Sequence, residues 1–313
     1  MSSSAILKFL FAVDGSDQAQ AAVEFAAKFL PPDRLEPVIF HIAGKAPEQL
    51  WDLQHEPTPF ASSGFSNWES EAKKDAENFL EKAEKAMVQA GVPEKRIRVV
   101  VRDRSVGIAR DLLAEALSGY DAVVMGRTGT NKLKELVLGG VANKLLGKLT
   151  DATQCVVSGD PSPHKVLLAV DASEGAAKAL EFLASLAGGV EKEVVIFHAI
   201  RHFRLPPYLL DLPEMSAAED RLIKEQKDAV RPILEEYRQR LAETGFNPNL
   251  IRIKIAAGVA SRAEAIIEET KKNGIGSIFI GRRGLSRVEQ FFMGRVSSKV
   301  VQLARNAAIW VVG

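Results

Sequence analysis

The sequence predicts two α/β domains, each a doubly wound parallel sheet with helices on both faces. Apolar strand segments alternate with amphipathic helical segments along the chain, which is typical of parallel strands covered by helices. The order of segments in the first half recurs in the second half. The chain has 313 residues, and since domains commonly hold roughly 150 residues, this length fits two of them.

An internal repeat supports this division, because short segments of the first half recur in the second half in the same order. Three matches carry the repeat: FAVDGS at Phe11–Ser16 with LAVDAS at Leu168–Ser173, VIFHI at Val38–Ile42 with VIFHA at Val195–Ala199, and Gly126 with Gly281. We therefore expect the two halves to share one fold.

The first half begins with an apolar run at Leu7–Val13, which predicts a buried strand. The Ala-rich amphipathic stretch Gln18–Leu30 predicts a helix that ends at Pro31-Pro32, because proline cannot continue a helix. Val38–Ile42 predicts the second strand, and a polar loop rich in Pro and Ser follows to about Asn67.

A long amphipathic helix is then expected up to Ala90, with Gly91 as its stop because glycine accepts the left-handed conformation that ends helices. The remaining elements follow from periodicity and breakers: a strand at Ile97–Val101, a helix at Ile108–Leu117, a strand at Ala122–Met125, a helix at Val141–Leu149 and a strand at Gln154–Ser158. The second half repeats this order and ends in a strand at Ala308–Val312. There, Pro232 is expected to kink or split the helix at about Ala217–Glu243.

The boundary between the halves is predicted at Asp160–Pro163, where proline and small polar residues break both periodic patterns. The predicted domains are residues 1–160 and 161–313. Because an unpaired apolar edge strand invites association, we expect the last strands of the halves, Gln154–Ser158 and Ala308–Val312, to pair with each other within the chain. A homodimer is the other association that the sequence allows.

The composition excludes several classes of protein. The 41 Lys and Arg nearly balance the 40 Asp and Glu, so we expect no general attraction to nucleic acid or to an anionic membrane. Cys155 is the only cysteine, which excludes a disulfide within the chain and a multi-cysteine zinc site. The first apolar run is shorter than the about 20 residues of a membrane helix and lacks signal-peptide features, so a cytoplasmic location is expected.

A glycine-rich loop follows the fourth strand of each half. Gly126-Arg127-Thr128-Gly129 is separated by nine residues from Gly139-Gly140, and Gly281-Arg282-Arg283-Gly284 by nine residues from Gly294-Arg295. Glycine lets main-chain amides approach an anion, and a helix N-terminus adds unpaired N–H groups with roughly half a positive charge. Since ligands of parallel sheets bind beyond the carboxyl ends of strands, Asp14 and Asp171 should face these loops, and a nucleotide would span the gap.

These motifs resemble the universal stress protein family in its tandem form, over nearly the full length. The resemblance rests on Val13–Ser16, on the His at the end of the second strand, and on the doubled Gly-x-x-Gly, nine-residue, Gly signature. It implies five-stranded sheets in the order 3-2-1-4-5 and domain pairing through the last strands. In the nucleotide-binding branch it also implies ATP or another adenine nucleotide, with Mg²⁺ as a companion ion.

Carried over to this sequence, the resemblance predicts nucleotide-binding positions at the strand ends and glycine loops of both halves. They are Ala12, Val13, Asp14, Ile42, Met125, Gly126, Arg127, Gly129, Gly139, Gly140, Val141, Ala169, Val170, Asp171, Ala199, Gly281, Arg282, Gly284, Gly294, Arg295, Val296 and Ser297. No catalytic residue and no metal site is predicted.

The sequence departs from the binding pattern after the last glycine of each half. The pattern has a hydroxyl residue there and another two residues later, but the positions hold Gly140 and Ala142 in the first half, and Arg295 and Ser297 in the second. Arg295 either clamps a phosphate or fills the pocket with its bulk. We therefore expect nucleotide binding in at least one half.

Other roles compete at the aspartates and histidines. Asp14 and Asp171 stand where a helix N-cap would stand, so capping and ligand contact are both open and can coexist. His41 and His198 have no Ser, Cys or metal-ligand partner at a recognisable spacing, which favours hydrogen-bonded structural histidines.

Three functions are compatible with these observations. The first is non-catalytic binding of adenine nucleotide in stress-response signalling. The second is a nucleotide-independent interaction module of the same fold. The third is a slow ATP hydrolase; the absence of a Gly-x-x-x-x-Gly-Lys-Ser/Thr loop and of a nucleophile elbow argues against an efficient one.

Overall fold

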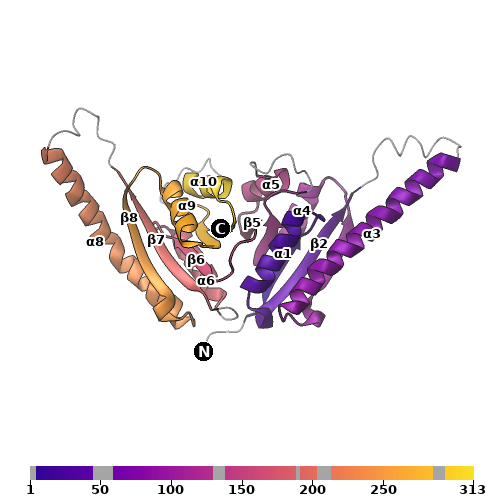
Figure 1. Ribbon diagram of the computed structural model, residues 1–313, viewed down its shortest axis with the longest axis horizontal. Helices are drawn as coiled ribbons and strands as arrows, with labels where there is room; N and C mark the ends of the chain where they lie inside the picture. Colours follow the sequence, from indigo (N-terminus) through magenta and orange to yellow (C-terminus); the bar gives the residue numbers. More distant parts are fainter. Residues whose placement is uncertain (1–4, 45–58, 130–137, 188–190, 203–212, 285–292) are drawn as a thin grey trace.

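The computed structural model describes residues 5–44, 59–129, 138–187, 191–202, 213–284 and 293–313, which form two α/β halves side by side (Figure 1). The elements of the first half are β1 (Leu7–Ala12), α1 (Asp17–Phe29), β2 (Leu35–Ala43), α3 (Pro59–Gln89), β3 (Arg98–Asp103), α4 (Ile108–Ala116), β4 (Ala122–Gly126), α5 (Gly140–Lys148) and β5 (Thr153–Ser158). The elements of the second half are β6 (Lys165–Ala169), α6 (Glu174–Ser185), β7 (Glu193–Arg201), α8 (Pro213–Glu243), β8 (Ile251–Val259), α9 (Arg262–Asn273), β9 (Ser277–Gly281), α10 (Arg295–Leu303) and β10 (Ala307–Val312).

All of these strands lie in one ten-stranded sheet with the order β3-β2-β1-β4-β5-β10-β9-β6-β7-β8. Neighbouring strands within each half are parallel, whereas β5 and β10 pair antiparallel. Each half has the order 3-2-1-4-5 counted along its own strands. The predicted fold class, strand order and pairing through the last strands are therefore confirmed.

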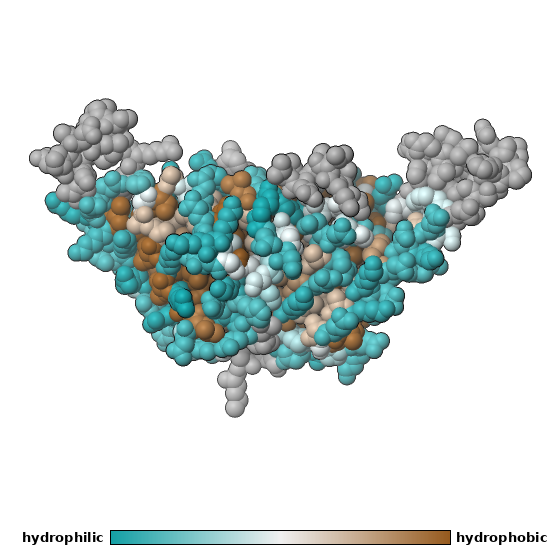
Figure 2. All heavy atoms as spheres, viewed as in Figure 1, coloured by the Kyte–Doolittle hydropathy of each residue, from teal (hydrophilic) through white to brown (hydrophobic). Residues whose placement is uncertain are grey.

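The helices cover both faces of each half, as doubly wound domains require. α1, α3, α6 and α8 pack into one apolar layer, and α4, α5, α9 and α10 into the other. The long helices α3 and α8 lie at the outer flanks (Figure 1), and the viewed surface is mostly polar with apolar residues between the elements (Figure 2). Among the described helices, none is both long and apolar enough to cross a membrane.

One expectation about the long helices is wrong, and splitting, one of the two effects expected of Pro232, does not occur. α3 begins at Pro59 and not near Asn67, and proline is favoured at the first helical position because its missing N–H would be unpaired there. α8 runs through Pro232 without being split. Pro232 lies on the exposed side of the helix, where water can satisfy the carbonyl that proline leaves without a donor.

The junction of the halves is the antiparallel pair of β5 and β10. Ala307 pairs with Ser158 and Trp310 with Cys155, and every residue of both strands is buried. Pairing turns two edge strands into central ones, so the edge that each half would expose alone is removed.

Aromatic rings from both halves pack together on one face of this junction. The Trp310 ring lies 5.3 Å from that of Phe279 and 5.5 Å from that of Phe29, measured between centroids. Phe9 packs 6.3 Å from Phe182 across the junction. These separations are in the range preferred by aromatic pairs, and the halves therefore share one core on this face.

Two buried arginines cross the junction on the opposite face. Arg127 donates from Nη1 to the carbonyl of Val301 at 2.5 Å and from Nη2 to that of Gln302 at 2.6 Å, in the last turn of α10. Arg282 donates in the same way to the last turn of α5, with Nη1 2.6 Å from the Leu146 carbonyl. A cation at a helix C-terminus is stabilising because the carbonyls there carry partial negative charge.

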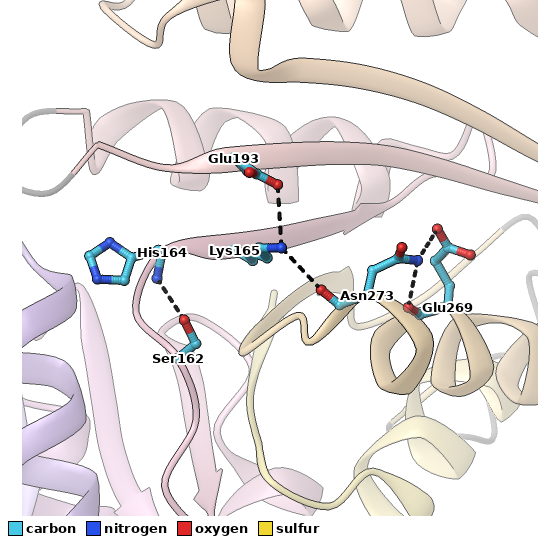
Figure 3. Close-up of polar contacts among 6 residues, drawn as sticks. All are labelled: Ser162, His164, Lys165, Glu193, Glu269 and Asn273. Carbon is cyan, nitrogen blue, oxygen red and sulfur yellow. Dashed lines mark hydrogen bonds and ion pairs between the residues drawn. The ribbon is translucent and has the colours of Figure 1, made fainter.

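The linker after β5 leads into β6, whose first residue is bonded to two neighbouring elements (Figure 3). The main-chain N–H of His164 donates to Ser162 Oγ at 3.4 Å. Lys165 Nζ, at the start of β6, lies 3.7 Å from Glu193 Oε2 and 3.4 Å from the carbonyl oxygen of Asn273 at the end of α9. The start of the second half is thus tied to both β7 and α9, while the predicted division at residue 160 stays a prediction.

Trp310→Ala should lower the free energy of unfolding by roughly 3–5 kcal/mol, because it leaves a cavity in the core that both halves share. Urea unfolding followed by circular dichroism measures this loss. Val106→Ala is the control, since Val106 is 65% exposed and exposed positions change stability by less than about 0.5 kcal/mol. Equal effects of the two substitutions would contradict the assigned core.

Candidate functional site

A pocket of about 260 Å³ lies at the carboxyl ends of β1, β2 and β4, beside the N-terminus of α5. Every residue of the first half that the sequence predicts as nucleotide-binding lines it: Ala12, Val13, Asp14, Ile42, Met125, Gly126, Arg127, Gly129, Gly139, Gly140 and Val141. The structure therefore brings these residues together, and their role in binding stays a prediction.

Part of the pocket wall was not predicted from the sequence. The additional lining residues are Ala19, Phe40, His41, Ile108, Leu112, Thr128 and Ala142. Ile108 and Leu112 come from α4, whose apolar positions have the spacing of an ordinary core-facing helix. No sequence signal separates a helix that faces the core from one that also borders a pocket.

Asp14 does not cap α1, which corrects one of the two roles left open for it. The N-cap is Ser16, whose Oγ accepts from the N–H of Ala19 at 3.2 Å. The Asp14 carboxylate holds this serine, since its Oδ1 accepts from Ser16 Oγ at 2.5 Å and from the Ser16 N–H at 3.1 Å. Oδ2 of Asp14 takes part in neither bond.

The glycine loop passes directly over Asp14. A methyl group at Gly129 would collide with Asp14 Oδ2, so the loop lies against the carboxylate as the sequence predicted. At Gly126, a methyl group would lie 2.8 Å from the main-chain carbon of Gln18 in α1. These two glycines are thus required for packing of the loop on Asp14 and on α1.

The first turn of α5 opens into the pocket. Its N-cap is Gly139, which provides no side-chain hydrogen bond, whereas α1 and α6 are capped by Ser16 and Ser173. A methyl group at Gly140 would meet no atom within 4 Å. Unpaired N–H groups and the helix dipole make such a terminus favourable for an anion.

The loop and helix start of each half form one unit. We call residues 126–129 with 139–141 the first cradle, and residues 281–284 with 294–296 the second cradle. The main-chain carbonyl of Arg127 accepts from the Gly139 N–H at 2.9 Å, and that of Arg282 accepts from the Gly294 N–H at 2.8 Å. Each loop is therefore hydrogen-bonded to the residue that starts its helix.

The side chains of Arg127 and Arg282 point away from the cradles. Arg127 and Arg282 are only 2% and 3% exposed, and both guanidinium groups are bonded to helix carbonyls of the other half. Burial, together with the charge of nearby Arg305, lowers the pKa of Arg127 to about 10, so it remains cationic at neutral pH. Any ligand contact of these residues would have to come from their main chains.

Each histidine forms a hydrogen bond to the main chain, which agrees with the structural role that the sequence favours. His41 Nδ1 lies 2.9 Å from the Val13 carbonyl, and His198 Nδ1 lies 2.7 Å from the Val170 carbonyl. A carbonyl oxygen can only accept, so Nδ1 carries the proton in both rings. Each histidine thereby ties the ends of the first and second strands of its half. Burial lowers the pKa of His198.

The second half repeats the arrangement around its aspartate. Asp171 Oδ1 accepts from Ser173 Oγ at 2.5 Å, and Ser173 caps α6. A methyl group at Gly284 would collide with Asp171 Oδ2. As in the first half, the serine is the cap and the aspartate supports it.

The remaining predicted positions of the second half lie at strand ends and at the start of α10. Ala169, Val170 and Ala199 are buried. Ser297 is buried, and its hydroxyl donates to the Gly281 carbonyl at 2.7 Å, so this hydroxyl is already committed within the fold. Arg295 is exposed at the first position of α10, and its two predicted roles, clamping a phosphate or filling the pocket, both stay predictions.

Within the described part of the chain, no group of three or more His, Cys, Asp or Glu side chains is arranged to hold a metal ion. The nine-residue spacers between the glycines lie largely outside the described residues, at 130–137 and 285–292.

Comparisons with known proteins agree with this architecture. The sequence profile of the Universal stress protein family matches residues 6–150 and 163–311. Universal stress protein YxiE from Bacillus subtilis (strain 168) is 31% identical over 145 residues, which cover 45% of this chain and 93% of that protein.

Several crystal structures match nearly the whole chain, among them the following two. A universal stress protein from Archaeoglobus fulgidus DSM 4304 has a TM-score of 0.60 and 18% identity, covering 100% of this chain and 99% of that chain. Protein PA1789 from Pseudomonas aeruginosa PAO1, described as functionally unknown, has a TM-score of 0.55 and 13% identity, covering 99% of this chain and 93% of that chain. At these identities the likeness shows the fold alone.

Gly129→Ala should destabilise the protein by about 1 kcal/mol, because the new methyl group displaces the Asp14 carboxylate that supports the Ser16 cap. Chemical denaturation measures the change. Gly140→Ala is the matched control in the same cradle: its methyl group meets no atom within 4 Å, and alanine is a better helix former than glycine. A Gly129→Ala variant as stable as the Gly140→Ala variant would show that the loop does not rest on Asp14.

The stability contributed at His198 should depend on pH. Because burial lowers its pKa in the folded state, the unfolded chain binds more protons below the unfolded pKa of about 6.5, and stability falls as the pH falls through that value. His198→Asn removes this titration and can keep a donor to Val170. Its free energy of unfolding should therefore decline less between about pH 7 and about pH 5 than that of the wild type; parallel declines would contradict the expectation.

Proposed function

The chain belongs to the universal stress protein family, and on that premise we propose that its first domain binds ATP or another adenine nucleotide without efficient turnover. The protein would act in the cytoplasm and signal this occupancy in the stress response through its shape or its associations. The observation that carries the proposal is a single pocket that joins an apolar wall, a carboxylate and an uncapped helix N-terminus.

The apolar wall suits a purine base. Phe40, Ile42, Ile108, Leu112 and Met125 line the pocket, and small-molecule sites typically combine such walls with a few polar groups. Its volume of about 260 Å³ is close to the lower end of small-molecule sites, roughly 300 Å³. The base would lie between the end of β2 and α4.

The polar groups suit the ribose and the phosphates. Asp14 Oδ2 has no part in holding the Ser16 cap and would accept hydrogen bonds from ribose hydroxyls. The N–H groups at the start of α5 would bind phosphate oxygens, and Gly140 leaves space there. Mg²⁺, a hard ion that keeps several waters, would be held mainly by the phosphate oxygens themselves.

Slow turnover is part of the proposal because the sequence has neither a Gly-x-x-x-x-Gly-Lys-Ser/Thr loop nor a nucleophile elbow. Asp14 Oδ1 accepts from Ser16 and His41 Nδ1 donates to the Val13 carbonyl, which leaves Asp14 Oδ2 and His41 Nε2 outside these bonds. Steady release of phosphate from ATP, abolished by Asp14→Ala, would favour the slow hydrolase instead.

A nucleotide-independent interaction role is the second candidate, and the second domain favours it. The Ser297 hydroxyl that would face a phosphate is committed to Gly281, and the strand edges β3 and β8 remain at the ends of the sheet. Edge strands are sites of association between chains, so a homodimer would use these edges and not the paired β5 and β10.

A thermal-shift titration with ATP and Mg²⁺ tests the proposal. Binding to the folded state alone stabilises it by about 2.7 kcal/mol at a ligand concentration of 100 times Kd. Asp14→Ala should abolish the shift, because it removes the ribose acceptor and the support of the cap.

Asp171→Ala is the matched control, since it makes the same change at the equivalent position of the second half and leaves the first pocket intact. It should retain the shift of the first domain. The absence of a shift at millimolar nucleotide in the wild type, with no nucleotide released on denaturation, would leave the interaction module as the function.

A further inference from the structure

We infer that each cradle is positioned by an arginine of the other domain: Arg282 positions the first cradle, and Arg127 positions the second. The inference rests on the proposed nucleotide site. It adds that the affinity of this site depends on a residue of the other domain. Arg127 and Arg282 are positioning residues here, because their side chains act through a helix.

The main chain of each arginine contacts its own cradle. The Arg127 carbonyl accepts from the Gly139 N–H at 2.9 Å, and the Arg282 carbonyl accepts from the Gly294 N–H at 2.8 Å. The main chain of each arginine therefore sets where its own helix starts.

The side chain of each arginine contacts the helix of the other cradle. Arg282 Nη1 lies 2.6 Å from the Leu146 carbonyl, and Nη2 lies 2.5 Å from the Leu149 carbonyl, at the C-terminal end of α5. Arg127 holds the C-terminal end of α10 through Val301 and Gln302. α5 and α10 are the helices whose N-termini form the first and the second cradle.

Together these contacts form a closed chain of hydrogen bonds across the junction. The Arg127 side chain bonds the first loop to the end of α10, and the start of α10 bonds to the second loop. The Arg282 side chain then bonds the second loop to the end of α5, and the start of α5 bonds to the first loop. α5 and α10 have nine residues each, or about 13 Å. A helix of that length moves as a rigid rod, so holding its C-terminus sets the position of its N-terminus.

The chemistry of the contact is specific to arginine. The planar guanidinium reaches two carbonyls of one helix end at once, whereas a lysine ammonium is a single point charge on a flexible stem. Both arginines are almost completely buried, where charge-assisted hydrogen bonds are strong and bulk water does not replace a lost one. Replacing either arginine by lysine therefore keeps the charge but removes the paired hydrogen bonds to the helix end.

The alternative is that the two arginines only hold the domains together. Loss of an arginine would then weaken nucleotide binding at both cradles in proportion to the loss of stability. If the arginine positions the cradle of the opposite domain, its loss should weaken nucleotide binding there. The weakening should be larger than that caused by another junction substitution that lowers stability by the same amount.

The test uses the full chain with Asp171→Ala, which restricts nucleotide binding to the first domain. Arg282→Lys in this background should raise the Kd for ATP, measured by calorimetry, about tenfold, within the usual range of coupling between sites. Arg283→Lys is the matched control: it lies next to Arg282 in the same loop and is exposed. It should leave Kd unchanged.

Trp310→Phe is the control for domain pairing, because it weakens the junction on the aromatic face. Suppose that Trp310→Phe and Arg282→Lys lower stability equally. If they then raise Kd equally, the inference is overturned. So would an Arg282→Lys variant that binds like the Arg283→Lys control. If Arg282→Lys does not fold, Arg282→Gln replaces it in the same comparison.

A measurement without nucleotide separates this inference from the proposed function. Hydrogen exchange of the amides of residues 140–142 should become faster in Arg282→Lys than in Arg283→Lys, with α10 of its own domain unchanged. If the parent protein binds no ATP, the proposed function fails and exchange alone decides the inference. Unchanged exchange at residues 140–142 overturns it.

Discussion

The antiparallel pairing of β5 with β10 is the contact on which the rest of the structure depends. It joins two parallel sheets into one of ten strands and buries strands that would otherwise be apolar edges. The same pairing brings Trp310 and Phe279 against Phe29 on one face. On the other face it brings the last turns of α5 and α10 within reach of the buried arginines.

The glycine-rich loops illustrate how one motif serves packing and binding together. Gly126 allows the start of α1 to approach β4, and Gly129 allows the loop to rest on Asp14. Among the glycines of the two motifs, only Gly140 has no atom within 4 Å of an added methyl group, and it lies at a helix start without a side-chain cap. The motif therefore builds the pocket mostly by permitting close contacts, and it offers an anion a site at one end.

The two halves have the same fold but different details at the equivalent helix starts. In the first half, Gly140 and Ala142 leave the start of α5 small and unobstructed. In the second half, an exposed Arg295 begins α10, and the Ser297 hydroxyl is used by the end of β9. This asymmetry supports the proposal that nucleotide binds in the first domain.

The sequence by itself determined the strand and helix order, the repeat, the family resemblance and part of the lining of the first pocket, because these depend on local periodicity and on motifs next to strand ends. The start of α3, the capping by Ser16 and the contribution of α4 to the pocket wall depended on contacts that periodicity does not encode. Only the tertiary structure decided where the side chains of Arg127 and Arg282 lie. Their side chains bond to helix ends of the opposite half, distant in sequence, and the direction of a side chain is set by packing and not by the motif in which it stands.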